Sequence, residues 1–199
     1  FILTAQADGT AKIWDAESGA LFRTLPAHKG PVLSAVYSRD GTRIATAGGD
    51  NIARIWDTAT GNLIRELIGH KSPVESVAFN HQGDKIVTAS TDRTARVWNV
   101  AAGTGIPLLP AHTLAVNTAV YSPDDAWIIT AGLDDAPRIY SANVDNLLAT
   151  AKVHLDRTLN PEERALYLPW EATPGSTMLT PVDRATSSAA RPSATAIPI

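Results

Sequence analysis

The 199-residue chain contains no cysteine, so it can form neither a disulfide framework nor a thiolate metal site. It also lacks an apolar run of roughly 18 residues, as a membrane-spanning helix requires, and a phosphate-binding glycine loop. Its 17 basic residues nearly balance its 20 acidic residues, which argues against a polyanionic partner. We expect a cytoplasmic protein that binds neither membranes nor nucleic acid, although a lack of cysteine does not by itself identify the compartment.

What the sequence does contain is a repeat. Trp14, Trp56, Trp98 and Tyr140 stand 42 residues apart. Each lies near the end of the same short sequence motif. A period of about 40–45 residues that ends in Trp-Asp is typical of a propeller blade. The four copies of this motif cover residues 8–15, 50–57, 92–99 and 134–141.

Other residues keep the same period, so the repeat extends over a whole structural unit. A threonine precedes the recurring aspartate by four residues, a histidine precedes it by 22, and a glycine follows the tryptophan by five. The second copy predicts four short strands: one over 32–37, one over 44–47, one carrying Trp56, and one over 63–67. A turn is predicted at 38–41, with equivalents at 80–83 and 122–125.

On these residues the chain resembles the WD-repeat β-propeller family, over residues 1–142. The resemblance implies an all-β fold, a partial β-propeller of about four WD-type four-stranded antiparallel blades. Phe1 aligns with the second strand of a blade, so the first copy lacks its first strand. The fourth copy departs from the pattern, with Pro137 inside its third strand, Tyr140 for Trp and Ser141 for Asp.

The resemblance also implies a buried hydrogen-bonded chain in each blade, from an indole to a hydroxyl, a histidine and an aspartate. Tyr140 should weaken the last of these chains. Such a network stabilises one arrangement of the blade, because unpaired buried polar groups cost about 1–3 kcal/mol each. The three predicted networks are His28, Thr46, Asp50 and Trp56; His70, Thr88, Asp92 and Trp98; and His112, Thr130, Asp134 and Tyr140.

The same residue types could form a hydrolytic triad, which is an alternative interpretation. An active site occurs once, however, whereas this set occurs three times, which favours a structural role. The Asp124-Asp125 and Asp134-Asp135 pairs lie in predicted turns without further oxygen ligands, and His81 and His154 have no partners at ligand spacing. We expect no catalytic residue, no cofactor and no metal.

Beyond the repeats, residues 143–169 predict a helical closing segment, and residues 170–199 have the Ser/Thr/Ala/Pro-rich composition of a disordered tail. The string from Leu159 to Leu168 resembles the segment that closes many bacterial multidomain WD-repeat proteins. We therefore expect the chain to be the C-terminal part of a longer protein.

The predicted function is a non-catalytic protein–protein interaction scaffold that binds a protein or peptide at one rim. The alternative is a sensor or target-recognition arm of a multidomain bacterial signalling enzyme whose catalytic domain precedes Phe1. In the resembling family, partners meet the loops before the first strand and between the second and third strands. The matching positions differ between blades, as drift at exposed positions would also produce; they are Pro31, Leu33, Gly49, Pro73, Glu75, Thr91, Ala115, Asn117 and Leu133.

Overall fold

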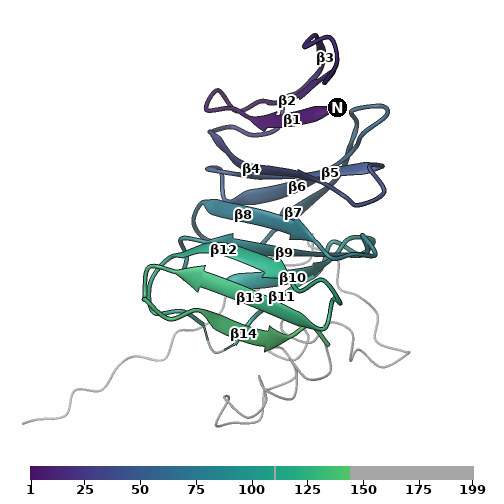
Figure 1. The fold of residues 1–199 in the computed structure, drawn as a ribbon. Coiled ribbons are helices and arrows are strands. Elements are labelled where there is room, and N and C mark those ends of the chain that lie inside the picture. The colour runs from purple at the N-terminus through teal and green to yellow at the C-terminus, as the bar shows by residue number, and fades with distance from the viewer. Residues whose placement is uncertain (110, 144–199) are drawn as a thin grey trace, which may run out of the picture. The chain divides into compact units, whose positions relative to one another are not determined.

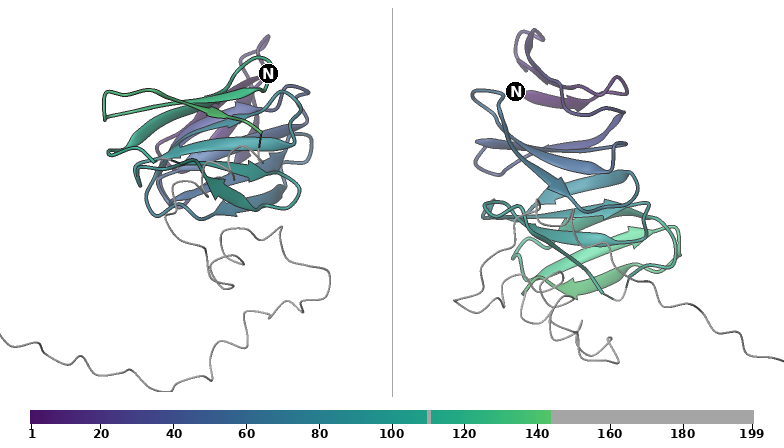
Figure 2. Two further views of the ribbon diagram at one scale, coloured as in Figure 1. Left: turned by 90° about the horizontal axis from the view of Figure 1, so that it is seen from below. Right: turned by 180° about the vertical axis from the view of Figure 1, so that it is seen from behind.

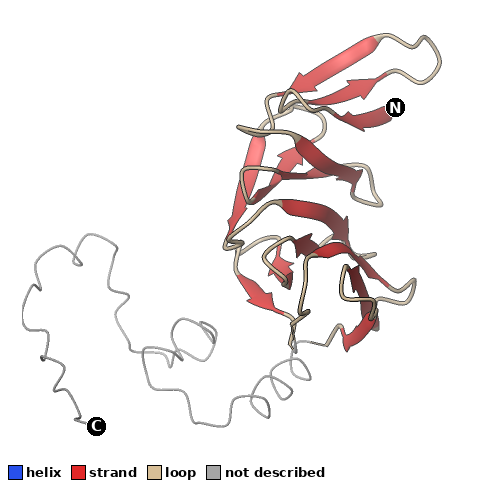
Figure 3. Ribbon diagram, turned by 90° about the vertical axis from the view of Figure 1, so that its left-hand side faces the viewer, coloured by secondary structure: helices blue, strands red, loops and turns tan. Residues whose placement is uncertain are grey.

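The computed structural model describes residues 1–109 and 111–143, and the regular elements of this part of the chain are all β-strands (Figures 1 and 3). The strands form four antiparallel sheets, which follow one another in chain order and which we call the first to fourth blades. The expected all-β architecture is confirmed. The helical segment and the tail predicted for 143–169 and 170–199 lie, apart from Asn143, outside the described residues.

The second and third blades each contain four strands, whose order in the sheet is their order in the chain. The second blade consists of β4 (Val32–Tyr37), β5 (Arg43–Gly48), β6 (Ile52–Asp57) and β7 (Leu63–Ile68). The third consists of β8 (Val74–Phe79), β9 (Lys85–Ser90), β10 (Ala95–Asn99) and β11 (Gly105–Pro107).

The outer two blades have three described strands each. The first consists of β1 (Ile2–Ala5), β2 (Ala11–Trp14) and β3 (Leu21–Leu25), which correspond to the second, third and fourth strands of a complete blade. The fourth consists of β12 (Val116–Tyr121), β13 (Trp127–Gly132) and β14 (Arg138–Ser141), which correspond to the first three.

One strand boundary differs from the prediction. Pro137 was expected inside the third strand of the fourth blade, but β14 begins at Arg138, directly after it. Proline has no N–H to donate to the ladder, so it is excluded from a strand that pairs on that side. The second blade pairs Ala47 with Ala53 at the corresponding position, whereas pairing in the fourth blade ends at Thr130 and Arg138.

Tight turns join the strands where the sequence predicts them. Gly41 and Gly83 adopt φ of 71° and 73°, and Asp125 adopts 56° at the equivalent position. Glycine enters this left-handed region without steric penalty, and aspartate is among the residues that tolerate it. Each turn is closed by a backbone hydrogen bond, such as that from Gly41 N–H to the Ser38 carbonyl at 2.9 Å.

The hydrophobic core lies between successive blades. Strand β8 contacts both β4 and β12, so the first strands of neighbouring blades lie side by side (Figure 2). Between the second and third blades, Ala45 and Ile55 pack with Ile86 and Trp98, and all four are almost completely buried. This packing fixes the ends of the blades, where the loops carry the candidate sites.

Candidate functional site

The second blade contains a continuous chain of hydrogen bonds between four side chains. Trp56 on β6 donates from Nε1 to Thr46 Oγ1 on β5 at 3.0 Å. Nε2 of His28, in the loop before β4, lies 2.9 Å from that hydroxyl oxygen. Nδ1 of the same ring lies 2.7 Å from Asp50 Oδ1 in the β5–β6 turn. These hydrogen bonds therefore connect the loop that enters the blade to its two central strands, β5 and β6.

An indole can only donate, so Thr46 Oγ1 accepts from Trp56. Nδ1 of His28 lies 2.7 Å from Asp50 Oδ1 and 2.6 Å from Nη1 of Arg54, a group that can only donate. Burial lowers the pKa of His28, although Asp50 opposes this effect, so the ring stays neutral. Burial by itself raises the pKa of Asp50, but hydrogen bonds from Arg54, His28 and the Lys29 amide outweigh it and lower that pKa to about 2.

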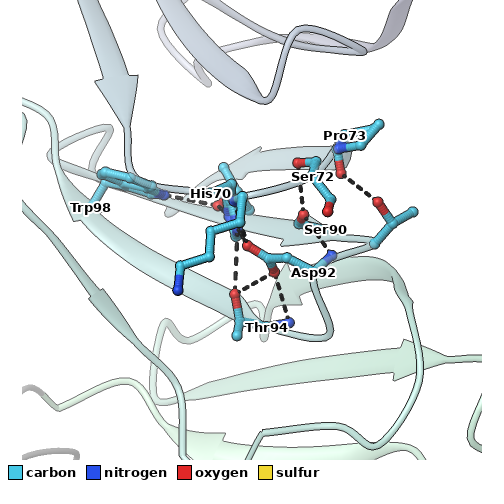
Figure 4. A network of polar contacts seen from close by, with 10 residues as sticks. His70, Ser72, Pro73, Ser90, Asp92, Thr94 and Trp98 are labelled. Atoms are coloured by element: carbon cyan, nitrogen blue, oxygen red, sulfur yellow. Dashed lines mark hydrogen bonds and ion pairs between the residues drawn. The ribbon is translucent and has the colours of Figure 1, made fainter.

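The third blade repeats the arrangement (Figure 4). Trp98 Nε1 donates to Thr88 Oγ1 at 2.8 Å, and His70 lies 2.7 Å from Thr88 Oγ1 through Nε2 and 2.9 Å from Asp92 through Nδ1. The Thr94 hydroxyl also donates to Asp92, at 2.6 Å. Burial alone would raise the pKa of Asp92, but hydrogen bonds from His70, Thr94 and a backbone amide hold it well below its usual range.

In the fourth blade, the histidine and aspartate keep their places and a tyrosine replaces the tryptophan. His112 lies 2.7 Å from Thr130 through Nε2 and 2.7 Å from Asp134 through Nδ1. Burial raises the pKa of the Tyr140 phenol, and the charge of Arg138 together with hydrogen bonds to Arg138 and Thr130 opposes that rise. The phenol therefore contacts the hydroxyl that an indole contacts in the other blades.

Each chain of hydrogen bonds connects the same kinds of groups as a hydrolytic triad. Its hydroxyl, however, is not exposed to solvent as a nucleophile would be. The histidine faces a hydroxyl through Nε2 and a carboxylate through Nδ1, as a general base would. However, Thr46, Thr88 and Thr130 are completely inaccessible to solvent. In the second and third blades the hydroxyl also accepts the indole proton, so one of its lone pairs is occupied. Their burial keeps a substrate carbonyl away from these hydroxyls, and we propose that the hydrogen-bonded chains stabilise the blades.

These pKa shifts predict that the folded protein becomes less stable as the pH is lowered. The unfolded chain protonates His28 below its ordinary pKa of 6.5, whereas burial keeps the folded ring neutral to lower pH. The unfolded chain then protonates Asp50 near 3.8, whereas the folded carboxyl resists protonation down to about 2. The unfolded state thus binds more protons in both windows, so the free energy of unfolding must fall as the pH drops through them.

Urea melts between pH 7 and pH 3 measure this loss directly. Asp50→Asn provides the control, because an amide does not titrate. We expect this variant to be less stable at pH 7 and to show a shallower fall below pH 4. A free energy of unfolding that stays constant over the whole range would contradict the assignment of the buried chains.

The nine predicted rim residues lie together at one end of each blade, and none is fully buried. In each blade, a backbone hydrogen bond joins the loop before the first strand to the turn between the second and third strands. Gly49 donates to the Pro31 carbonyl at 2.9 Å, and Leu133 donates to the Ala115 carbonyl at 2.9 Å. Thr91 likewise donates to the Pro73 carbonyl at 3.1 Å. The two loops of a blade therefore present one continuous surface.

The middle residue of each rim set occupies a β-bulge. Pairing between the first two strands shifts register between Val32 and Ser34, and it shifts in the same way around Glu75 and around Asn117. Leu33, Glu75 and Asn117 are thus the extra, unpaired residues of three equivalent bulges. A bulge bends the strand and re-aims its side chain. The sequence repeat carried no signal for this irregularity.

The structure adds a basic position that we did not predict. Arg54 ion-pairs with Asp50 at 2.7 Å and with Glu66 at 2.9 Å, and Arg138 ion-pairs with Asp134 at 3.1 Å. Both positive charges help to keep the neighbouring aspartate ionised. The signal was present in the sequence, because a basic residue recurs with the 42-residue period at Lys12, Arg54, Arg96 and Arg138.

Within residues 1–109 and 111–143, no group of three or more His, Asp or Glu side chains is arranged to hold a metal ion. The same residues include no helix long and apolar enough to span a membrane. Both members of the Asp124-Asp125 pair have protein partners. Asp124 accepts from the Ser122 hydroxyl at 2.5 Å, and Asp125 accepts from the His81 amide at 2.8 Å.

Four-stranded antiparallel blades in succession, tied internally by buried polar chains, define a repeat protein of the β-propeller class. The family described as WD domain, G-beta repeat matches residues 19–57, 61–99 and 103–141, which make up more than half of the chain. The chain therefore belongs to the WD-repeat family, whose members typically bind protein partners and are typically non-catalytic. Comparison with curated proteins gave no match.

Proposed function

We propose that this protein is a non-catalytic scaffold in the cytoplasm, and that it binds a protein or peptide at the rim formed by the nine predicted residues. The observation that carries the proposal is the contrast between two sets of repeated positions. The buried chains keep histidine, threonine and aspartate in all three blades and always contain an aromatic residue. The three bulges, in contrast, present leucine, glutamate and asparagine at one structural position.

The chemistry of the rim supports a specific contact. Leu33 is exposed, Glu75 is half-buried beside it on the next blade, and Asn117 is exposed on the blade after that. Since β8 lies beside both β4 and β12, an extended segment that crosses the first strands would meet an apolar, an acidic and an amide side chain in turn. Such a sequence of side chains can discriminate between partners by charge and by hydrogen bonding.

Glu75→Ala and Asn117→Ala test the rim. We expect each substitution to reduce the recovery of partners in a pull-down with the intact protein by roughly fivefold, since an interface residue that matters contributes at least about 1 kcal/mol. Recovered proteins are quantified by mass spectrometry. Glu17→Ala and Asn62→Ala remove the same side chains from exposed turns at the opposite end of the blades. Equal recovery with all four variants would refute the rim assignment.

A further inference from the structure

Two leucines are exposed in the loops of the fourth blade, at the end of the blades that carries the rim. Leu114, in the loop before β12, is 51% exposed, and Leu133, in the turn between β13 and β14, is 59% exposed. Ala115 directly follows Leu114, and its carbonyl accepts a hydrogen bond from the Leu133 N–H at 2.9 Å. The two leucines therefore lie close together. The second and third blades have glycine, serine or threonine at these two places.

Two positively charged residues lie beside this leucine pair. Arg93, in the turn between β9 and β10, is exposed, and its carbonyl accepts a hydrogen bond from the N–H of His112, two residues before Leu114, at 3.1 Å. Lys71, in the loop before β8, is also exposed, and its N–H donates to Asp92, the neighbour of Arg93, at 2.9 Å. These bonds join the loops of the third and fourth blades. We call the resulting surface the leucine–arginine patch; it consists of Lys71, Arg93, Leu114 and Leu133.

The two positive charges of the patch have no counter-charge within the described part of the chain. Neither Lys71 nor Arg93 forms an ion pair with another described residue. The carboxylate between them, that of Asp92, already accepts hydrogen bonds from His70, Thr94 and the Lys71 amide. A partner that covers the leucines must therefore leave these cations solvated or supply a negative charge to them.

The acidic residues near the patch determine where such a negative charge can lie. Asp135, two residues after Leu133, is exposed and takes the place in the fourth blade that Arg93 takes in the third. Like charges repel, so an acidic group of a partner is disfavoured next to the β13–β14 turn and favoured next to the β9–β10 turn. The patch is thus polar in a defined sense, with its positive side on the third blade.

We propose that the leucine–arginine patch binds a segment of a partner protein that carries an aliphatic side chain next to an acidic one. The aliphatic side chain packs against Leu114 and Leu133, where burial of apolar surface provides affinity. The acidic side chain accepts hydrogen bonds from Arg93 and is attracted by Lys71, which provides specificity. This inference rests on the function proposed for the rim and names the chemistry of its partner. All four residues belong to two adjacent blades, and the first blade contributes none of them.

Fluorescence polarisation with labelled peptides tests the proposal on the full chain. The probe is a short peptide of serine and glycine with Glu-Leu-Glu at its centre, and the comparison peptides carry Gln-Leu-Gln, Lys-Leu-Lys or Glu-Ala-Glu there. We expect the Glu-Leu-Glu peptide to bind about fivefold more tightly than the Gln-Leu-Gln peptide, as one exposed ion pair allows. The Glu-Ala-Glu peptide should bind roughly tenfold more weakly, because it buries less apolar surface.

Variants of the protein assign the binding to the patch. Arg93→Glu should reverse the charge preference, so that Lys-Leu-Lys becomes the tightest peptide. Leu114→Ser and Leu133→Thr place the residues of the third blade in the fourth, and each should weaken the Glu-Leu-Glu peptide by roughly fivefold. Arg39→Gln is the matched control, because it removes an exposed arginine from the β4–β5 turn at the opposite end of the blades. This control should bind as the wild-type protein does.

Two results would overturn the proposal. One is a wild-type protein that binds the Glu-Leu-Glu peptide no more tightly than the Gln-Leu-Gln peptide, and the other is an Arg93→Glu protein, folded by circular dichroism, that keeps the wild-type preference. Either failure is distinguishable from failure of the rim, which is tested separately with Glu75→Ala and Asn117→Ala. If those two substitutions lower the recovery of natural partners while the peptides show no charge preference, the rim stands and the leucine–arginine patch does not.

Discussion

Replacing Trp98 by phenylalanine is expected to lower the free energy of unfolding by an amount on the order of 1–3 kcal/mol. The indole donates to Thr88 at 2.8 Å, and both Thr88 and Trp98 are almost completely inaccessible to solvent. The smaller ring leaves the Thr88 hydroxyl with an unpaired acceptor site that water cannot fill. It also leaves a void in the packed layer between the second and third blades, where lost contacts add to the loss.

Tyr140→Phe is the matched substitution in the fourth blade, and we expect it to cost less, about 1 kcal/mol. Phenylalanine fills the volume of the tyrosine ring, so only the hydroxyl is lost. Thr130 keeps its 2.7 Å contact with His112, which in turn keeps Asp134. Urea melts of both variants measure the two losses under the same conditions. If Tyr140→Phe were as destabilising as Trp98→Phe, the phenol would have to be as important to its blade as the indole is.

The repeat made most of the fold predictable, because a period constrains many positions at once. A single His28 or Thr46 carries little information, but the recurrence of both at a fixed distance from Asp50 indicates that they meet in space. The strands, the turns at Gly41 and Gly83, and the residues of the buried chains follow from that one regularity. The rim is different, because the resemblance to the family implies it and the period does not. Its residues differ from blade to blade, so it stays a prediction.

The 42-residue period predicts the wrong buried residue where the pairing between the third and fourth strands differs from one blade to the next. A strict 42-residue step from the buried Leu67 reaches Leu109, but the structure buries Leu108 instead. In the second blade, pairing between β6 and β7 shifts by one residue next to Trp56. In the third blade, Trp98 pairs directly with Gly105 and there is no such shift, so β11 runs one residue ahead. A repeat in sequence does not reveal this local difference, because the loop that follows restores the spacing.

The glycine at this junction leads to a prediction that runs against the repeat. Leu21 and Leu63 occupy the places equivalent to Gly105, so the pattern alone suggests that Gly105→Leu should stabilise the third blade. We expect the opposite, a loss on the order of 1–3 kcal/mol, because a Cβ atom on residue 105 would lie 2.2 Å from Trp98 Cε3. The indole cannot move away, since it is buried and bound to Thr88.

Leu63→Gly is the reciprocal change in the second blade, and it serves as the control. Leu63 is half-exposed and lies beyond the register shift, so its removal should cost about 1 kcal/mol or less, the ordinary penalty for glycine in a strand. Urea melts compare the two variants, and near-ultraviolet circular dichroism follows the environment of Trp98. A more stable Gly105→Leu protein would show that β11 can adopt the shifted register of β7. In that case the close contact between Gly105 and the indole would not be what sets the length of this strand.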